Sequence, residues 1–316
     1  MGINIVLPLL LVVAALSLVD LCHGEIIDRN DTVEGGQFRY FYDTAMGAAA
    51  CQNVILLGVG TAMSVNDYKL ISNDIVTGQN IVTIVYDFAA GFPFKNSEEG
   101  YIKVINAIVA ELHTLVPICN DPLTTNRTII VGGHSASGGA TWKCLKKLNF
   151  IPNGFLGLDP YKLDPNGATQ AAIPTLNIGF TKSTCLVCVD KAAMASYNTS
   201  GKDHRVLYLI NNSEKNGKKD VALHCSFTDR GCMGFVCPSR EGDASVRALV
   251  GFSIQAFVKS LATGVYNKQD FVVQASATSA MEMPVTYELY VNQDEVVTSS
   301  ERKRGYSPVQ VDVAFA

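Results

Sequence analysis

Short apolar runs alternate along the chain with longer segments in which apolar residues recur at helical spacing. The short runs are rich in Val, Ile and Leu and predict strands at 38–42 (an edge strand), 53–58, 80–88, 128–131, 154–158, 175–180 and 206–210. The helical pattern predicts helices at 97–115, 140–148 and 244–261. Strands that alternate with helices build a mostly parallel sheet covered on both faces, so this order predicts an α/β fold.

The two ends of the chain differ from this pattern. Residues 5–19 are largely apolar and are followed by Cys22-His23-Gly24, so we expect residues 1–24 to be a secretory signal peptide. The lack of Lys and Arg before this stretch leaves an uncleaved N-terminal anchor as the alternative. Residues 266–316 show no helical face, which predicts a β-rich extension packed on or beside the α/β domain at 25–265. Its Arg302-Lys303-Arg304 triplet indicates an exposed turn or, alternatively, a protease processing site.

Cysteines and sequons agree with export. Eight of the nine cysteines follow the predicted signal, an even number that suits up to four disulfides in an oxidising compartment. Cys185-Leu-Val-Cys188 has no second such pair at metal-ligand spacing, so we expect disulfides there rather than zinc. Four Asn-x-Ser/Thr sequons are candidate glycan acceptors in an exported eukaryotic protein: Asn30, Asn126, Asn198 and Asn211. The expected location is extracellular or in the lumen of the secretory pathway.

Charge and composition narrow the classes of partner. The formal net charge is −4, and no basic stripe or interleaving of aromatic and basic residues occurs, so nucleic acid is not an expected partner. After residue 24 no apolar stretch reaches the roughly 20 residues of a membrane helix, so we expect no stable membrane span in the mature chain. The sequence contains no metal-ligand cluster or phosphate-cradling loop, and we therefore expect no metal and no cofactor.

The segment after the run at 128–131 carries the clearest chemical signal. It reads Gly132-Gly133-His134-Ser135-Ala136-Ser137-Gly138-Gly139, a cluster of small residues around one serine. This is the layout of a nucleophile elbow, whose tight strand-to-helix turn needs small residues two positions before and two after the serine. Gly133 and Ser137 occupy those positions, where the usual pattern has two glycines. Ser135 is the predicted nucleophile.

A serine nucleophile needs a base, which in this layout follows it in the chain. Among the five histidines, only His224 falls in the loop between the last predicted parallel strand and the long C-terminal helix. His23 leaves with the signal, His113 lies on an earlier helix, and His204 precedes a strand. His134 stands inside the elbow and cannot turn back on its own neighbour. We therefore predict His224 as the base.

The acid that orients this base is predicted at a strand end between the serine and the histidine. Asp159 directly follows the strand at 154–158, and Pro160 fixes the direction of the chain after it. Asp190, after the strand at 175–180, is the alternative, and Asp164 is a more distant one. An aspartate before proline also commonly serves only as a turn or cap residue. Asp159 is the predicted acid.

Backbone amides are predicted to form the oxyanion hole. One belongs to Ala136, directly after the nucleophile, and the second to Gly60 or Thr61, in the loop after the strand at 53–58.

An apolar loop follows the strand at 80–88 and reads Ala89-Ala90-Gly91-Phe92-Pro93-Phe94. Phe92 and Phe94, together with His134, are the candidate substrate-binding residues. The alternative for this loop is packing against the hydrophobic core.

On these motifs the chain resembles the α/β-hydrolase superfamily over about residues 38–261. The resemblance rests on the elbow, on Gly157-Leu158-Asp159-Pro160 and on His224-Cys225-Ser226-Phe227. The chain is most similar to the chlorophyllase group and the related platelet-activating-factor acetylhydrolase group, which share a Gly-His-Ser-x-Gly-Gly elbow and an acid after the next strand. It departs from them at Ser137-Gly138-Gly139 and in reading Gly58-Val59-Gly60-Thr61, without His-Gly, in the oxyanion loop. The resemblance implies an α/β-hydrolase fold and a serine esterase that uses Ser135, Asp159 and His224.

The residues and the resemblance together predict a secreted serine hydrolase that cleaves a lipid-like or otherwise partly apolar carboxylic ester, with a small-molecule ester as its substrate. A catalytically silent binding protein on the same scaffold is one alternative. A serine peptidase or an acyltransferase is another, because acyl-enzyme formation is common to all these enzymes.

Overall fold

A computed structural model describes residues 24–88, 98–120, 126–161, 173–182, 192–200, 204–212, 222–229, 243–272, 286–292 and 310–311. The predicted signal peptide, apart from Gly24, and the Arg302-Lys303-Arg304 triplet lie outside these residues. Among the described helices, none combines the length and the apolar character that crossing a membrane requires.

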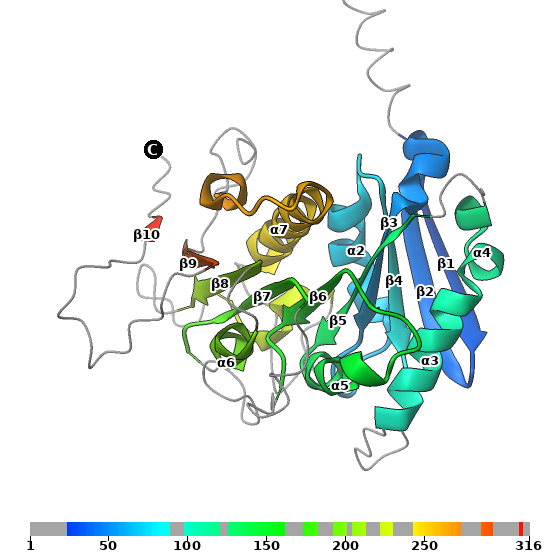
Figure 1. The fold of residues 1–316 in the computed structure, drawn as a ribbon, viewed down its shortest axis with the longest axis horizontal. Helices are drawn as coiled ribbons and strands as arrows, with labels where there is room; N and C mark the ends of the chain where they lie inside the picture. The colour runs from blue at the N-terminus through cyan, green and yellow to red at the C-terminus, as the bar shows by residue number, and fades with distance from the viewer. Residues whose placement is uncertain are drawn as a thin grey trace, which may run out of the picture.

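A single sheet of ten strands forms the centre of the described part, in the order β1-β2-β4-β3-β5-β6-β7-β8-β9-β10 (Figure 1). Its six central strands run parallel: β4 (Ile81–Asp87), β3 (Asn53–Gly58), β5 (Thr128–His134), β6 (Gly154–Leu158), β7 (Thr175–Phe180) and β8 (Arg205–Asn211). Their residues are almost all buried, as expected for parallel strands covered on both faces. The predicted α/β fold is therefore confirmed.

Antiparallel strands extend both edges of this parallel core. β1 (Ile26–Val33) and β2 (Gly36–Asp43) form a hairpin, and β2 pairs antiparallel with β4. The prediction that 38–42 is an edge strand is wrong, because β1 covers the outer side of β2. On the other side, β9 (Thr286–Val291) pairs antiparallel with β8 and carries β10 (Gln310–Val311), so these two strands continue the central sheet.

Helices lie on both faces of the sheet (Figure 1). One face carries α3 (Glu98–Ala110), α5 (Ala136–Cys144) and α6 (Ala192–Thr199), with α4 (Leu112–Leu115) following α3; the other carries α2 (Lys69–Val76) and α7 (Asp243–Thr263). Short 3-10 turns connect these elements: η1 (Thr44–Gln52), η2 (Val65–Tyr68), η3 (Pro117–Asn120), η5 (Leu145–Lys147), η7 (His224–Phe227) and η8 (Lys268–Phe271).

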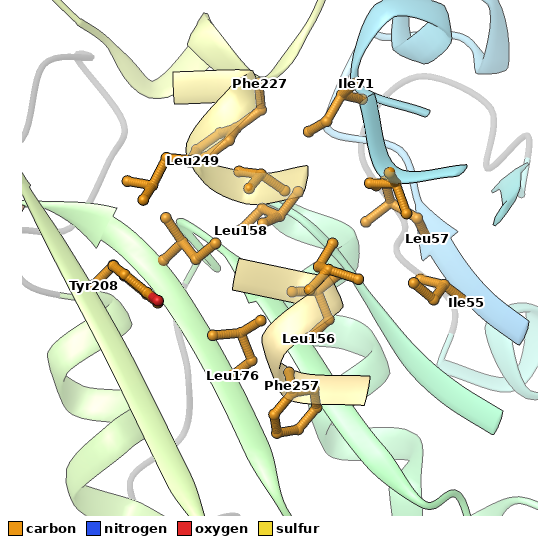
Figure 2. Packing of buried hydrophobic residues seen from close by; sticks show 14 of the residues in the cluster. Ile55, Leu57, Ile71, Leu156, Leu158, Leu176, Tyr208, Phe227, Leu249 and Phe257 are labelled. Atoms are coloured by element: carbon orange, nitrogen blue, oxygen red, sulfur yellow. The ribbon is translucent and has the colours of Figure 1, made fainter. Parts of the chain in front are cut away.

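Successive residues of each central strand supply the two hydrophobic cores in turn. On β3, Ile55 and Leu57 pack with the residues of α2 and α7, whereas Val54 and Leu56 pack on the side of α3 and α5. Figure 2 shows part of the first core, where Ile55 and Leu57 share the cluster with Ile71 of α2 and with Leu249 and Phe257 of α7. This two-sided burial packs the sheet between two hydrophobic cores and leaves the strand ends for polar groups.

Several predicted elements differ from the observed ones at their boundaries. The predicted helix at 97–115 is broken, because Glu111 leaves helical geometry (φ −103°, ψ 9°) between α3 and α4. The predicted helix at 140–148 starts earlier, since α5 begins at Ala136, directly after the elbow serine. α2 and β1 were not predicted.

One disulfide is described in full: Cys51 of η1 pairs with Cys119 of η3. Cys225, the residue after His224, is also disulfide-bonded. Cys144 is free and buried, so it takes no part in the disulfides that the sequence predicts. Burial, and secondarily the Glu98 carboxylate, raise the pKa of the Cys144 thiol to about 12. The Cys185–Cys188 segment lies outside the described residues.

Candidate active site

Ser135 stands at a strained turn between β5 and α5. Its backbone has φ 56° and ψ −124°, a conformation that costs free energy for any residue with a side chain. Hydrogen bonds hold this strain in place: the Ser135 amide donates to the carbonyl of Leu158 (3.0 Å), and its own carbonyl accepts from the amides of Gly139 (3.2 Å) and Tyr161 (2.8 Å). This geometry is that of a nucleophile elbow.

Small residues around Ser135 are needed for the turn to close. A Cβ on Gly133 would lie 2.3 Å from the Ser137 hydroxyl, and one on Gly138 would lie 2.6 Å from the carbonyl of Gly133. Ser137 itself fits because its fully buried hydroxyl donates to the carbonyl of His134 (2.9 Å). The departure of Ser137 from the usual glycine is therefore compatible with the elbow.

Asp159 and His224 meet beside the elbow although they are 65 residues apart in the chain. Oδ2 of Asp159 lies 2.6 Å from Nδ1 of His224, and their side chains are only 13% and 8% exposed. Asp159 directly follows β6, and its amide donates to the carbonyl of Ile178 on β7 (2.7 Å). A carboxylate at Nδ1 keeps the proton on that nitrogen, so Nε2 is the nitrogen that can accept a proton as a base. The alternative acids, Asp164 and Asp190, lie outside the described residues.

The loop that carries His224 is tied to two helices. The Ser226 hydroxyl accepts from the amide of Leu223 (2.8 Å) and donates to the carboxylate of Asp243, at the start of α7. The Asp229 carboxylate accepts from the amides of Lys69 (3.0 Å) and Leu70 (2.9 Å), at the start of α2. These contacts fix the position from which His224 faces the elbow.

His134 is completely buried, and both its ring nitrogens are engaged. Nδ1 lies 2.7 Å from the Tyr68 hydroxyl, and Nε2 lies 2.8 Å from the backbone carbonyl of His224. The rings of His134 and His224 are 4.5 Å apart between centroids. The prediction that His134 binds substrate is wrong, because the side chain has no exposed surface. The sequence pointed to His134 only through its place in the elbow, while its contacts come from segments far along the chain.

The amides predicted to donate to the oxyanion differ in their hydrogen bonding. The amide of Gly60 donates to the Tyr68 hydroxyl (2.7 Å), so the prediction of Gly60 as an oxyanion donor is wrong. Ala136 is the first residue of α5, where helical amides lack intrahelical acceptors and the helix dipole is positive. Within the described residues, neither Ala136 nor the exposed Thr61 has an acceptor for its amide. These two remain the predicted donors.

Two histidines that the sequence discounted as the base lie away from the site. Phe92 and Phe94 lie outside the described residues. His113 is exposed on α4, and His204 precedes β8 at the amino ends of the strands, opposite the edge of Ser135. No cluster of metal-ligating side chains occurs in the described part of the chain.

A mostly parallel sheet covered on both faces, a serine at a strained strand-to-helix turn, and an Asp–His pair following later strands define the α/β-hydrolase fold. No protein-family model matches the chain, and no curated protein matches it. Solved structures are similar at the level of the fold.

Est1E from Butyrivibrio proteoclasticus shares 11% identity over 75% of this chain and 99% of its own, with a TM-score of 0.49. A dienelactone hydrolase from Anabaena variabilis shares 12% identity over 72% of this chain and 96% of its own (TM-score 0.48). A CIB-like hydrolase from Thermoplasma acidophilum shares 11% identity over 60% of this chain and 88% of its own (TM-score 0.45). One fold hosts many activities, so the chemistry of this chain depends on its own residues.

Proposed function

We propose that this protein is an exported serine hydrolase that cleaves a carboxylic ester through Ser135, His224 and Asp159. The observation that carries the proposal is the 2.6 Å contact between Asp159 and His224 beside a strained elbow serine. The Ser135 amide donates to the carbonyl of Leu158, the residue before Asp159. The ring of His134, the residue before Ser135, lies 4.5 Å from the ring of His224 between centroids. All three residues thus share one edge of the sheet.

The proposed reaction has two stages, acylation of Ser135 and hydrolysis of the acyl-enzyme. Nε2 of His224 takes the proton of the Ser135 hydroxyl as its oxygen attacks the ester carbonyl. The amides of Ala136 and Thr61 stabilise the oxyanion of the tetrahedral intermediate. The imidazolium then protonates the leaving alcohol, and water, activated by His224, hydrolyses the acyl-enzyme.

The electrostatics of the site favour this order of proton transfers. The Asp159 carboxylate stabilises the positive charge that forms on His224, and low exposure of both side chains strengthens that interaction. Burial, and secondarily the neighbouring His224, hold the pKa of His134 well below its usual range. His134 is therefore neutral and adds no second positive charge beside the transient imidazolium.

The proposed substrate is a lipid-like or otherwise partly apolar ester. Support comes from the elbow and from Asp159, which resemble the corresponding motifs of the chlorophyllase and platelet-activating-factor acetylhydrolase groups. This resemblance is limited to the motif residues. The apolar loop with Phe92 and Phe94 is proposed to contact the apolar part.

Export and glycosylation belong to the same proposal. The Cys51–Cys119 disulfide suits an oxidising compartment. Asn30, Asn126 and Asn198 are exposed, whereas Asn211 is half-buried at the end of β8. Glycans are therefore proposed at the three exposed asparagines in preference to Asn211.

The test is fluorophosphonate labelling together with turnover of p-nitrophenyl esters from acetate to palmitate. We expect both signals in the wild-type protein and neither in Ser135→Ala. Ser253→Ala is the matched control, because Ser253 is a buried serine of α7 whose hydroxyl bonds only within its own helix (Val250 carbonyl, 2.9 Å). Folded wild-type protein without labelling or turnover contradicts the proposal and favours a binding protein, and transfer of the acyl group to added alcohol identifies an acyltransferase.

A further inference from the structure

A chain of hydrogen bonds links the oxyanion loop to the loop of the proposed base. The Gly60 amide lies 2.7 Å from the Tyr68 hydroxyl, the hydroxyl lies 2.7 Å from Nδ1 of His134, and Nε2 of His134 lies 2.8 Å from the carbonyl of His224. Tyr68 and His134 are both fully buried and stand 66 residues apart. We call Tyr68 and His134, with these three contacts, the Tyr–His bridge.

The proton positions in the Tyr–His bridge follow from the groups at its two ends, an amide that can only donate and a carbonyl that can only accept. The carbonyl of His224 can only accept, so Nε2 of His134 carries a hydrogen and donates it. The buried His134 ring is neutral, which leaves Nδ1 as an acceptor. The Gly60 amide can only donate, so the Tyr68 oxygen accepts from it and gives its own hydrogen to Nδ1. The alternative acceptor, Sδ of Met63, lies farther away at 3.3 Å.

Residue 60 has to be glycine for the Tyr–His bridge to form. A Cβ at this position would lie 2.9 Å from Nδ1 of His134, closer than carbon atoms approach in real structures. Gly60 thus serves the bridge through both its amide and its lack of a side chain.

We propose that Tyr68 and His134 are positioning residues that hold the oxyanion loop, with Thr61, at a set distance from the base His224. The loop would bind the carbonyl oxygen of the ester while the base takes the proton of the attacking serine, so their separation governs the stabilisation of the transition state. His224 is then held twice: Asp159 orients its ring, and His134 fixes its backbone carbonyl. This inference rests on the proposed function and adds two residues that touch neither substrate nor the reacting atoms.

The first test is Tyr68→Phe, which removes one oxygen atom and leaves the shape of the side chain. We expect kcat to fall by up to about 100-fold, the loss that a misplacement of roughly 1 Å at a reacting group can cause, with KM changed less than about threefold. Tyr208→Phe is the matched control. Tyr208 is equally buried, and its hydroxyl donates to the carbonyl of Phe271 (2.6 Å) on η8 instead. We expect the control to lower the melting temperature without lowering kcat.

The second test uses two replacements of His134. In His134→Gln the side-chain amide reaches about as far as Nε2 and keeps a donor for the His224 carbonyl, whereas His134→Phe keeps none. We expect kcat to decrease in the order wild type, Gln, Phe. The double variant Tyr68→Phe/His134→Phe should be no slower than His134→Phe alone, because both substitutions interrupt the same hydrogen-bond network.

The outcomes separate this inference from the proposed function. Wild-type kcat in Tyr68→Phe, or an equal loss of kcat in Tyr208→Phe, overturns the positioning role while the hydrolase stands. If Tyr68→Phe does not fold, equal kcat in His134→Gln and His134→Phe overturns it. Wild-type protein that neither labels nor turns over overturns the proposed function itself, and the catalytic role of the bridge with it.

Discussion

At the scale of single residues, the candidate site combines strain with burial. Ser135 is held at φ 56° by backbone contacts on both sides, and such a conformation costs on the order of 1–3 kcal/mol. Burial opposes the protonation of His134, because no part of its side chain is exposed. Its neutral form is required for the Tyr–His bridge, so its titration is coupled to folding.

This coupling predicts an acid-dependent loss of stability. In the unfolded chain His134 titrates near 6.5, whereas burial lowers its pKa in the folded protein. As the pH falls below about 6.5, the unfolded chain binds a proton that the folded one does not, and the free energy of unfolding drops by up to about 1.4 kcal/mol per pH unit. Urea titrations between pH 7.5 and 5 should show this slope reduced in His134→Gln. The exposed His113 supplies the control, and a slope in His113→Gln that differs from wild type as much as that of His134→Gln contradicts the assignment.

At the scale of elements, the loop of His224 is stabilised by the two helices on one face of the sheet. Asp229 reaches the first amides of α2, and Ser226 reaches Asp243 at the start of α7. A carboxylate at a helix N-terminus satisfies free amides and interacts favourably with the helix dipole. The same residue therefore caps α2 and anchors the base.

Asp229→Ala should affect both stability and activity. We expect the free energy of unfolding to fall by about 1 kcal/mol through loss of the cap, and kcat to fall several-fold because the loop of His224 loses an anchor. Asn267→Ala is a suitable comparison, since Asn267 caps η8 by accepting from the amide of Gln269 (3.2 Å). Chemical denaturation measures the effect on stability, and ester turnover measures the effect on activity. A normal kcat in Asp229→Ala would show that Asp229 caps α2 without positioning His224.

At the scale of the whole molecule, the Cys51–Cys119 disulfide joins the two ends of a long stretch of the fold. Its sequence separation is 68, and β3, α2, β4 and α3 lie between the two cysteines. Closing so long a loop restricts the unfolded chain far more than the folded one.

Removing this disulfide should therefore destabilise the protein strongly. For Cys51→Ala/Cys119→Ala we expect a loss of about 4 kcal/mol in the free energy of unfolding, measured by denaturant titration under non-reducing conditions. Cys144→Ala, which removes a buried free thiol, should cost only about 1 kcal/mol. A double variant no less stable than Cys144→Ala would refute a major role for the cross-link.

Local rules made much of this fold predictable from the sequence. The strands at 53–58, 154–158 and 175–180 match β3, β6 and β7 residue for residue, because uninterrupted apolar runs suit strands buried on both faces. The elbow was predictable since only small residues close so tight a turn. Asp159 and His224 were predictable because each follows a strand. The sequence proposed them separately, and in the structure Oδ2 of Asp159 lies 2.6 Å from Nδ1 of His224.

Other features depend on contacts between segments that are distant in the chain. α5 begins within a run of small residues of low helical tendency because the elbow directs the chain into it, and the local pattern had predicted a later start. β1 was missed because its residues are half-exposed and lack a buried apolar run.

The sequence by itself determined the α/β order of elements, the elbow and the three candidate catalytic residues, since each follows from periodicity, side-chain size or chain order. Only the tertiary structure decided that His134 and Gly60 serve the Tyr–His bridge rather than the substrate or the oxyanion. Tyr68 and His134 are 66 residues apart, and no local preference encodes a 2.7 Å contact across that separation. That contact exists because β5 and the loop after β3 end at the same edge of a parallel sheet, where the fold brings their polar groups within hydrogen-bonding reach.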